Sequence, residues 1–372
     1  MSKTALHRCC TSGVLKTSSN LCGNANGHLA ELSRLESLTT RRDEHLELFL
    51  ASSVVVSSLA MGWNVRRVLS WELQASALLV ALFSVGMLRH KVDLDYTLPE
   101  LVDLGRYPID ELRGAAGRAL VARAREDLRT TGCASFPGFL GAAALADAVE
   151  EAARKAPAAF ATDATHNAYQ LSASDASLPE AHVRNLRMRT RVASTAYDEL
   201  AADGALRRLY ANDVFLDLVG AVTGARVFRL DDALGAASIN VFEPAWEHAW
   251  HYDESEYTVT LSLQAADEGG AFEFTKPLRN SSDDLAAAAT AAVVSTHSTY
   301  DAAPRGGAST PAVSAAPFAP GTLQIFAGRY SLHRVAPVGG ASRRLVAVFC
   351  FADAPGFVNT PDVQEMFWGR TA

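Results

Sequence analysis

The regular alternation of apolar and polar residues in TVTLSLQ, residues 258–264, constrains the fold of this chain more than any other stretch. In an extended strand, this alternation places the apolar side chains on one face and the hydroxyl and amide side chains on the other. Short strands and turns continue from Val227 onward, whereas helical periodicity dominates the region before it. This order, helices followed by strands, predicts an α+β domain in which helices brace a β core.

The helical signals are strongest in residues 111–132. Small and apolar residues recur there at four-residue spacing with charged residues between them, which is typical of an amphipathic helix that ends at Gly132. Residues 133–140 predict a short strand and a turn. Further helices are expected in three later segments, residues 141–156, 194–202 and 204–222.

The composition limits the classes of function. The chain has 372 residues, of which 49% are apolar, so it can bury a sizeable core in one large domain or two average ones. The net charge of −7 and the lack of a basic domain argue against a nucleic-acid-binding protein. Five cysteines form no CxxC pair, which favours a reducing compartment over a disulfide framework or a zinc ribbon.

The N-terminal region differs in texture from the rest. Residues 1–45 carry acidic residues only in their second half, and they predict a disordered tail or an organellar transit peptide. Within residues 46–95, two uncharged apolar stretches, 48–65 and 73–88, are slightly short for membrane spans. They predict either a membrane hairpin through residues 48–88 or a pair of buried or amphipathic helices. The protein is therefore expected in the cytoplasm or an organelle, with membrane anchoring as the alternative.

The main domain is expected to span residues 96–372, and a segment of low complexity interrupts it. Residues 279–316 are rich in Ala, Ser, Thr, Gly and Pro, which predicts a long loop insertion in the β core with at most one short strand. A loop of this length within a compact domain is a lid or a disordered segment.

An imidazole and a carboxylate precede the alternating strand in WHYDESEY. If the strand period is extended backward, His251 and Asp253 fall on one face and Tyr252 on the other, while His248 faces away from His251. A nitrogen and an oxygen ligand on one face can bind a single cation, and His333 is the best candidate for a third ligand. Two histidines and one carboxylate form the facial triad of non-heme iron sites, which leaves coordination positions open.

Two arginines follow His333 at the start of the apolar stretch LVAVFCF. Arg343 and Arg344 point to opposite faces of that predicted strand, so only one can form a bidentate pair with the carboxylate of a small ligand. Asn240, in the earlier strand SINVF, is a candidate contact for a cosubstrate or substrate.

These motifs carry a family resemblance over residues 100–356. WHYDESEYTVTLSLQ, FAGRYSLHRVAPVGG and RRLVAVFCFADAPG resemble the Fe(II)/2-oxoglutarate-dependent oxygenases. Together with LGRYPIDELR, GCASFPGFL, HNAY, GGAFEF and LRN, they resemble more narrowly the branch of carrier-free amino-acid halogenases and related hydroxylases. The resemblance implies a double-stranded β-helix, or jelly-roll, core.

The resemblance also implies the roles of particular residues. Iron ligands are implied at His251, Asp253 and His333, with 2-oxoglutarate bound by Arg344 and with Arg343 as the rival. Halogenases of this branch have a small residue at the position of Asp253, because chloride takes that iron position. The acid therefore indicates a hydroxylase or another oxygenase instead of a halogenase, with Fe(II), 2-oxoglutarate as cosubstrate, dioxygen, and ascorbate as an optional reductant.

The expected function is hydroxylation of a small molecule, such as a free amino acid, with 2-oxoglutarate decarboxylated to succinate. Two alternatives remain open at this point: a protein-residue (prolyl-type) hydroxylase, and a non-catalytic β-helix module that senses a ligand or binds a partner. No nucleic-acid partner is expected.

Overall fold

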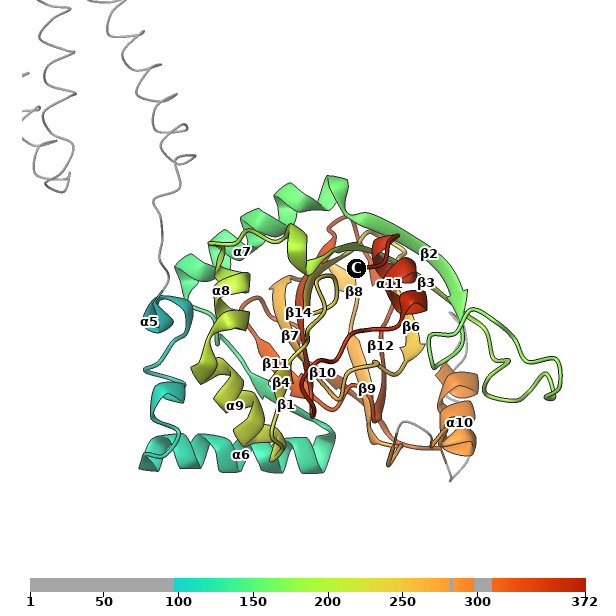
Figure 1. The fold of residues 1–372 in the computed structure, drawn as a ribbon, viewed down its shortest axis with the longest axis horizontal. Coiled ribbons are helices and arrows are strands. Elements are labelled where there is room, and N and C mark those ends of the chain that lie inside the picture. The colour runs from blue at the N-terminus through green and yellow to red at the C-terminus, as the bar shows by residue number, and fades with distance from the viewer. Residues whose placement is uncertain (1–96, 282–283, 298–309) are drawn as a thin grey trace, which may run out of the picture. The chain divides into compact units, whose positions relative to one another are not determined.

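The computed structural model describes residues 97–281, 284–297 and 310–372 (Figure 1). The tail expected at residues 1–45 and the apolar segments expected at 46–95 lie outside these ranges. Within them, no helix is long and apolar enough to cross a lipid bilayer.

Two antiparallel sheets form the core of the described region. The major sheet has the strand order β1-β11-β7-β14-β5-β3-β2, with β4 paired to β14, and the minor sheet has the order β10-β9-β12-β6. Their strands are β1 (Cys133–Phe136), β2 (Phe160–His166), β3 (Met188–Thr195), β4 (Phe228–Arg229), β5 (Ala237–Phe242), β6 (His248–His251), β7 (Tyr257–Gln264), β9 (Phe272–Pro277), β10 (Val313–Ala316), β11 (Leu323–Phe326), β12 (Ser331–Val335) and β14 (Arg344–Ala352). A separate two-stranded ladder joins β8 (Glu268–Gly269) and β13 (Val338–Gly339).

The chain crosses repeatedly between the two sheets. Strands β5, β7, β11 and β14 lie together in the major sheet, and β6, β9, β10 and β12 make up the minor sheet. The two four-stranded sets therefore form a double-stranded β-helix, or jelly roll, which closes around a shared interior. The predicted α+β class with a jelly-roll core is confirmed.

Helices cover the outer face of the major sheet. They are α5 (Leu98–Leu101), α6 (Ala115–Thr131), α7 (Ala142–Lys155), α8 (Ala205–Ala211) and α9 (Asp213–Thr223). Their apolar side chains pack in one cluster with Val259, Leu261 and Leu263 of β7. Figure 1 shows α6, α8 and α9 on one side of the sheets, with α10 (Ala287–His297) and α11 (Pro361–Trp368) on the other.

Two helix predictions need correction. Residues 194–202 do not form a helix, because residues 194–195 end strand β3, which pairs with β2 and β5, and only a short 3-10 turn follows. The helix expected at 204–222 is broken at Asn212, whose side-chain oxygen caps α9 by accepting from the amides of Val214 and Phe215. Gly132 ends α6 in the left-handed conformation, as its position predicted.

The segment 279–316 holds the short strand expected there, β10, and a helix that the sequence did not indicate, α10. The helix went unrecognised because its run of Ala, Thr and Val shows no alternation between an apolar and a polar face. Val293 and Val294 of α10 pack in one cluster with Trp250 and Leu332 of the minor sheet.

The polar face of β7 points into the jelly roll instead of toward solvent. Thr258, Thr260 and Ser262 are all buried, since the apolar face of the same strand is turned outward against the helices. The polar face of β7 therefore gives the interior of the jelly roll polar side chains, which a binding site requires.

Candidate metal centre

The structure brings His251, Asp253 and His333 together. His251 is the last residue of β6, Asp253 follows two residues later, and His333 lies in β12 directly opposite His251 in the antiparallel pair. Side chains opposite each other on neighbouring strands are in contact range, which explains how two histidines far apart in the chain converge. The continuous strand from 250 to 264 assumed in the sequence analysis is wrong, because β6 belongs to the minor sheet and β7 to the major sheet.

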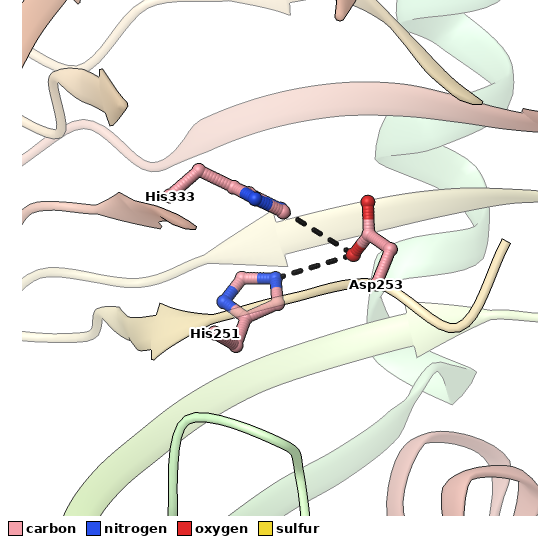
Figure 2. Close-up of side chains that lie close together, drawn as sticks. All are labelled: His251, Asp253 and His333. Carbon is pink, nitrogen blue, oxygen red and sulfur yellow. Dashed lines mark ion pairs between the residues drawn. The ribbon is translucent and has the colours of Figure 1, made fainter. Parts of the chain in front are cut away.

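The three side chains point toward one another (Figure 2). Oδ1 of Asp253 lies 3.4 Å from Nε2 of His251 and 3.3 Å from Nε2 of His333. One ligand atom from each residue falls within 4.8 Å of the other two. Ligand atoms about 2.1 Å from a cation on one octahedral face would be about 3 Å apart, so the spacing fits a single metal ion.

Both imidazoles are oriented by the same local device. Nδ1 of His251 lies 2.7 Å from the carbonyl oxygen of Ala249, and Nδ1 of His333 lies 2.9 Å from that of Ser331. A carbonyl can only accept, so Nδ1 carries the proton in each ring and Nε2 presents a lone pair to the centre. Burial, reinforced by the neighbouring His333, lowers the pKa of His251 and keeps it in the neutral form that binds metal.

The carboxylate of Asp253 is held from its other oxygen. The hydroxyl of Thr258 donates to Oδ2 at 2.5 Å, and this leaves Oδ1 directed at the two imidazoles. Burial alone would raise the pKa of Asp253, but without a metal a proton on Nε2 of His333 or His251 is attracted to Oδ1, and this holds the pKa well below its usual range. A bound metal ion would take the place of that proton. The acid is therefore an anionic ligand.

A glycine is required beside this carboxylate. Gly328 accepts the backbone hydrogen bond of Asp253, and a β-carbon at position 328 would collide with Oδ2 of Asp253 and with the Thr258 hydroxyl. The sequence analysis assigned no role to Thr258 or Gly328. Their roles depend on the packing of two loops, which the spacing of residues does not reveal.

Tyr252, which lies between the candidate ligands His251 and Asp253, is held by backbone hydrogen bonds and by ring contacts. Tyr252 donates its amide to the carbonyl of Ala168, and its own carbonyl accepts from Nε2 of Gln170. Its ring stacks on Tyr169 at 5.7 Å between centroids, and its hydroxyl contacts Thr290 of α10 at 2.8 Å. Through Ala168 and Tyr169, the HNAY motif thus holds the turn that carries His251 and Asp253.

Arg344 and Arg343 occupy contrasting environments. The Arg344 side chain is buried against Phe318 and Phe242, with the guanidinium carbon 3.7 and 5.3 Å from the two ring centroids. Its Nε and Nη1 have no hydrogen-bond partner among the described residues, and burial lowers its pKa to about 9. Arg343 is partly exposed and pairs with Glu243 at 3.2 Å.

Arg344 faces the same interior as the three converging residues. Its strand neighbours Leu345 and Ala347 pack outward against the helices, so Arg344 points inward by alternation. Asn240 lies on the inner face of β5, half-buried, and its Oδ1 accepts from Ser238 at 3.3 Å. The interior therefore contains three side chains that could hold a cation and a buried guanidinium that has no anionic partner among the described residues.

Comparison with known proteins identifies structures of similar fold. No protein-family model matches the sequence, and no curated protein matches it significantly. The α-ketoglutarate-dependent epimerase SnoN from nogalamycin biosynthesis is 16% identical, with 64% of this chain and 84% of that chain covered and a TM-score of 0.41. A 2OG-Fe(II) oxygenase from Burkholderia pseudomallei is 18% identical, with 63% of this chain and 92% of that chain covered and a TM-score of 0.40. A prolyl-4-hydroxylase from Pseudomonas putida is 14% identical, with 63% of this chain and 99% of that chain covered and a TM-score of 0.37. At such low identities and TM-scores, function has to be argued from the site residues of this chain.

Proposed function

We propose that this chain is an Fe(II)- and 2-oxoglutarate-dependent oxygenase. The observation that carries the proposal is the convergence of Nε2 of His251, Oδ1 of Asp253 and Nε2 of His333 on one point inside a jelly roll. Two neutral imidazoles and one carboxylate with open positions are the ligand set typical of non-heme ferrous iron. No cysteine contributes to the cluster, so the soft-ligand sites of zinc ribbons and iron–sulfur clusters do not fit.

The buried guanidinium of Arg344 supports 2-oxoglutarate as the cosubstrate. A dicarboxylate can chelate a metal through one end and present its far carboxylate to an arginine. An unpartnered cation inside a protein is costly, and a bidentate carboxylate is the anion that matches its geometry. Arg343 is the weaker candidate, because Glu243 already neutralises it at the surface.

The protein groups divide the work among themselves. His251 and His333 present lone pairs fixed by their Nδ1 hydrogen bonds, and Thr258 turns one oxygen of Asp253 toward them. When bound, iron would supply the activation of dioxygen that oxidation of an unactivated C–H bond requires, with 2-oxoglutarate as the electron donor. His251, His333 and Arg344 are buried and Asp253 is partly buried, which restricts water at the reacting centre.

Asp253 favours hydroxylation over halogenation, because its carboxylate takes the position that a halide would need. We propose a small-molecule substrate such as a free amino acid, with dioxygen consumed, 2-oxoglutarate decarboxylated to succinate, and ascorbate as an optional reductant. This substrate class follows from the resemblance of the motifs, and a protein-residue hydroxylase is the rival outcome of the test.

The test is succinate formation from 2-oxoglutarate with Fe(II) and ascorbate, measured with free amino acids and with proline-containing peptides. We expect succinate above background with the wild type, stimulation by one class of substrate, and loss of the signal in His333→Ala. Stimulation by peptides alone would favour the protein hydroxylase. Metal binding without succinate from any substrate would favour a non-catalytic module.

A further inference from the structure

His248 lies against the proposed metal ligand His251 in a way that the sequence did not predict. The two rings are stacked, with centroids 3.6 Å apart and planes inclined by 11°. Residues three apart in a regular strand face opposite sides, and His248 was expected to point away. That expectation is wrong, because β6 is irregular at this point.

A bulge in β6 explains the change of face. His251 pairs with His333, but His248 pairs with Val335, so three steps along β6 correspond to two along β12. The extra residue reverses the alternation and brings His248 to the same side as His251. Bulges next to active sites commonly redirect a side chain in this way.

His248 is enclosed on its remaining sides. Between ring centroids, Phe367 of α11 lies 5.4 Å from His248, and His166 lies 6.2 Å from it at an interplanar angle of 86°. The residue is buried, and its Nε2 has no hydrogen-bond partner within the described part of the chain. A buried, unsatisfied nitrogen costs stability, so a flat ring at this position needs a reason other than packing.

The contacts of the His251 ring show how a parallel ring at position 248 can restrict its orientation. The hydrogen bond from Nδ1 to Ala249 orients the His251 ring, but it holds the ring at one atom only. His333 contacts one side of His251, at 4.2 Å between centroids and 57° between planes, and His248 lies parallel at 3.6 Å. The parallel contact covers the whole face of the ring, so it adds to the hydrogen bond in resisting tilting of the ring.

We propose that His248 is a positioning residue that holds the His251 ring in its ligating orientation by stacking, with α11 supporting it through Phe367. The proposal rests on the metal site described under Proposed function. It assigns no metal contact to His248 itself.

The test is cobalt(II) binding to the otherwise intact protein without 2-oxoglutarate. The visible absorption spectrum and the cobalt dissociation constant are measured. His248→Leu fills the space without a planar face, and we expect it to weaken binding about 10- to 100-fold, the usual effect of removing support behind a ligand. His248→Phe retains a planar face and should stay within a few-fold of wild type, with the same spectrum. Phe367→Ala removes the support without touching His251 and should weaken binding less than His248→Leu does.

The outcomes are separable. Binding by His248→Leu within two-fold of wild type would overturn the proposal, and so would an equal loss in His248→Phe and His248→Leu. Thermal unfolding of each metal-free variant shows whether it folds, and if His248→Leu does not, unchanged affinity in Phe367→Ala overturns the proposal. If the wild type binds no cobalt, or His251→Ala binds it as well as wild type, the metal site itself is wrong.

Discussion

Replacing Arg344 with methionine is expected to stabilise the ligand-free protein and to remove its response to 2-oxoglutarate. The side chain is 2% exposed, its Nε and Nη1 have no partner among the described residues, and its nearest neighbours are two aromatic rings. Methionine is similar in length, uncharged and adaptable, so it can fill the same space.

The magnitude follows from the pKa. Burial lowers the pKa of Arg344 from 12.5 to about 9, a difference that corresponds to about 5 kcal/mol of unfavourable free energy for the charged form. The cation–π contact with Phe318 stabilises the charged form by about 2 kcal/mol, which offsets part of this cost. Replacing a buried charge with a well-packed apolar residue commonly stabilises a protein by about 1–4 kcal/mol. We therefore expect the melting temperature of Arg344→Met to rise by at least about 2 °C without ligand.

The assay is thermal unfolding with and without 2-oxoglutarate, each in the presence and absence of cobalt(II). A ligand present at 100 times its dissociation constant stabilises the wild type by about 2.7 kcal/mol, whereas Arg344→Met should show little of this gain. Arg343→Met is the matched control, because Arg343 forms a partly exposed pair with Glu243 worth at most about 1 kcal/mol. The control should keep the full response to 2-oxoglutarate.

Two results would refute the reasoning. Destabilisation of Arg344→Met by several kcal/mol without ligand would mean that the guanidinium already has a partner in the protein. A normal 2-oxoglutarate response in Arg344→Met, with a lost response in Arg343→Met, would assign the carboxylate contact to the other arginine.

Three further predictions concern the triad and its surroundings. Asp253→Gly should lower metal affinity and succinate formation about 100-fold or more, and unimpaired turnover would mean that the ligand is misassigned. Gly328→Ala should weaken cobalt(II) binding at least about 10-fold, since its methyl group displaces the Asp253 carboxylate. Gly105→Ala, whose methyl group meets only Asp103 at 3.4 Å, is the control, and equal effects of the two substitutions would contradict the steric argument. Burial lowers the pKa of His166 from 6.5 to about 4, so its contribution to stability is complete above pH 6.5 and is lost as the pH falls toward 4. Urea denaturation measures the free energy of unfolding at pH 7 and at pH 4.5. The decrease between the two pH values should be about 2–3 kcal/mol smaller in His166→Gln than in the wild type, and equal decreases would contradict a buried neutral ring.

The sequence predicted three ligand candidates and two candidate arginines, but it did not predict the contacts that orient these side chains. The alternation in TVTLSLQ correctly identified two faces of β7. It did not show that the polar face is buried, because the same alternation occurs in a strand whose polar face lines the interior and in one whose polar face meets solvent. Thr258 and Thr260 are buried inside the jelly roll, while the helices cover the opposite, apolar face.

The path of the chain around His251 was equally hidden. The break between β6 and β7 and the bulge in β6 both arise from pairing with strands distant in the sequence, chiefly β12. Local periodicity cannot report such pairing, which is why His248 was placed on the wrong face. His251 and Asp253 nevertheless converge, because the turn at Tyr252 is fixed by Ala168 and Gln170.

The central claim is that three protein atoms bind one metal ion. The most direct test is an X-ray structure of crystals grown anaerobically with Fe(II), with anomalous scattering recorded on both sides of the iron absorption edge. We expect a single iron peak about 2.0–2.2 Å from Nε2 of His251, Oδ1 of Asp253 and Nε2 of His333. No iron at this position, or iron bound by a different set of side chains, would contradict the claim.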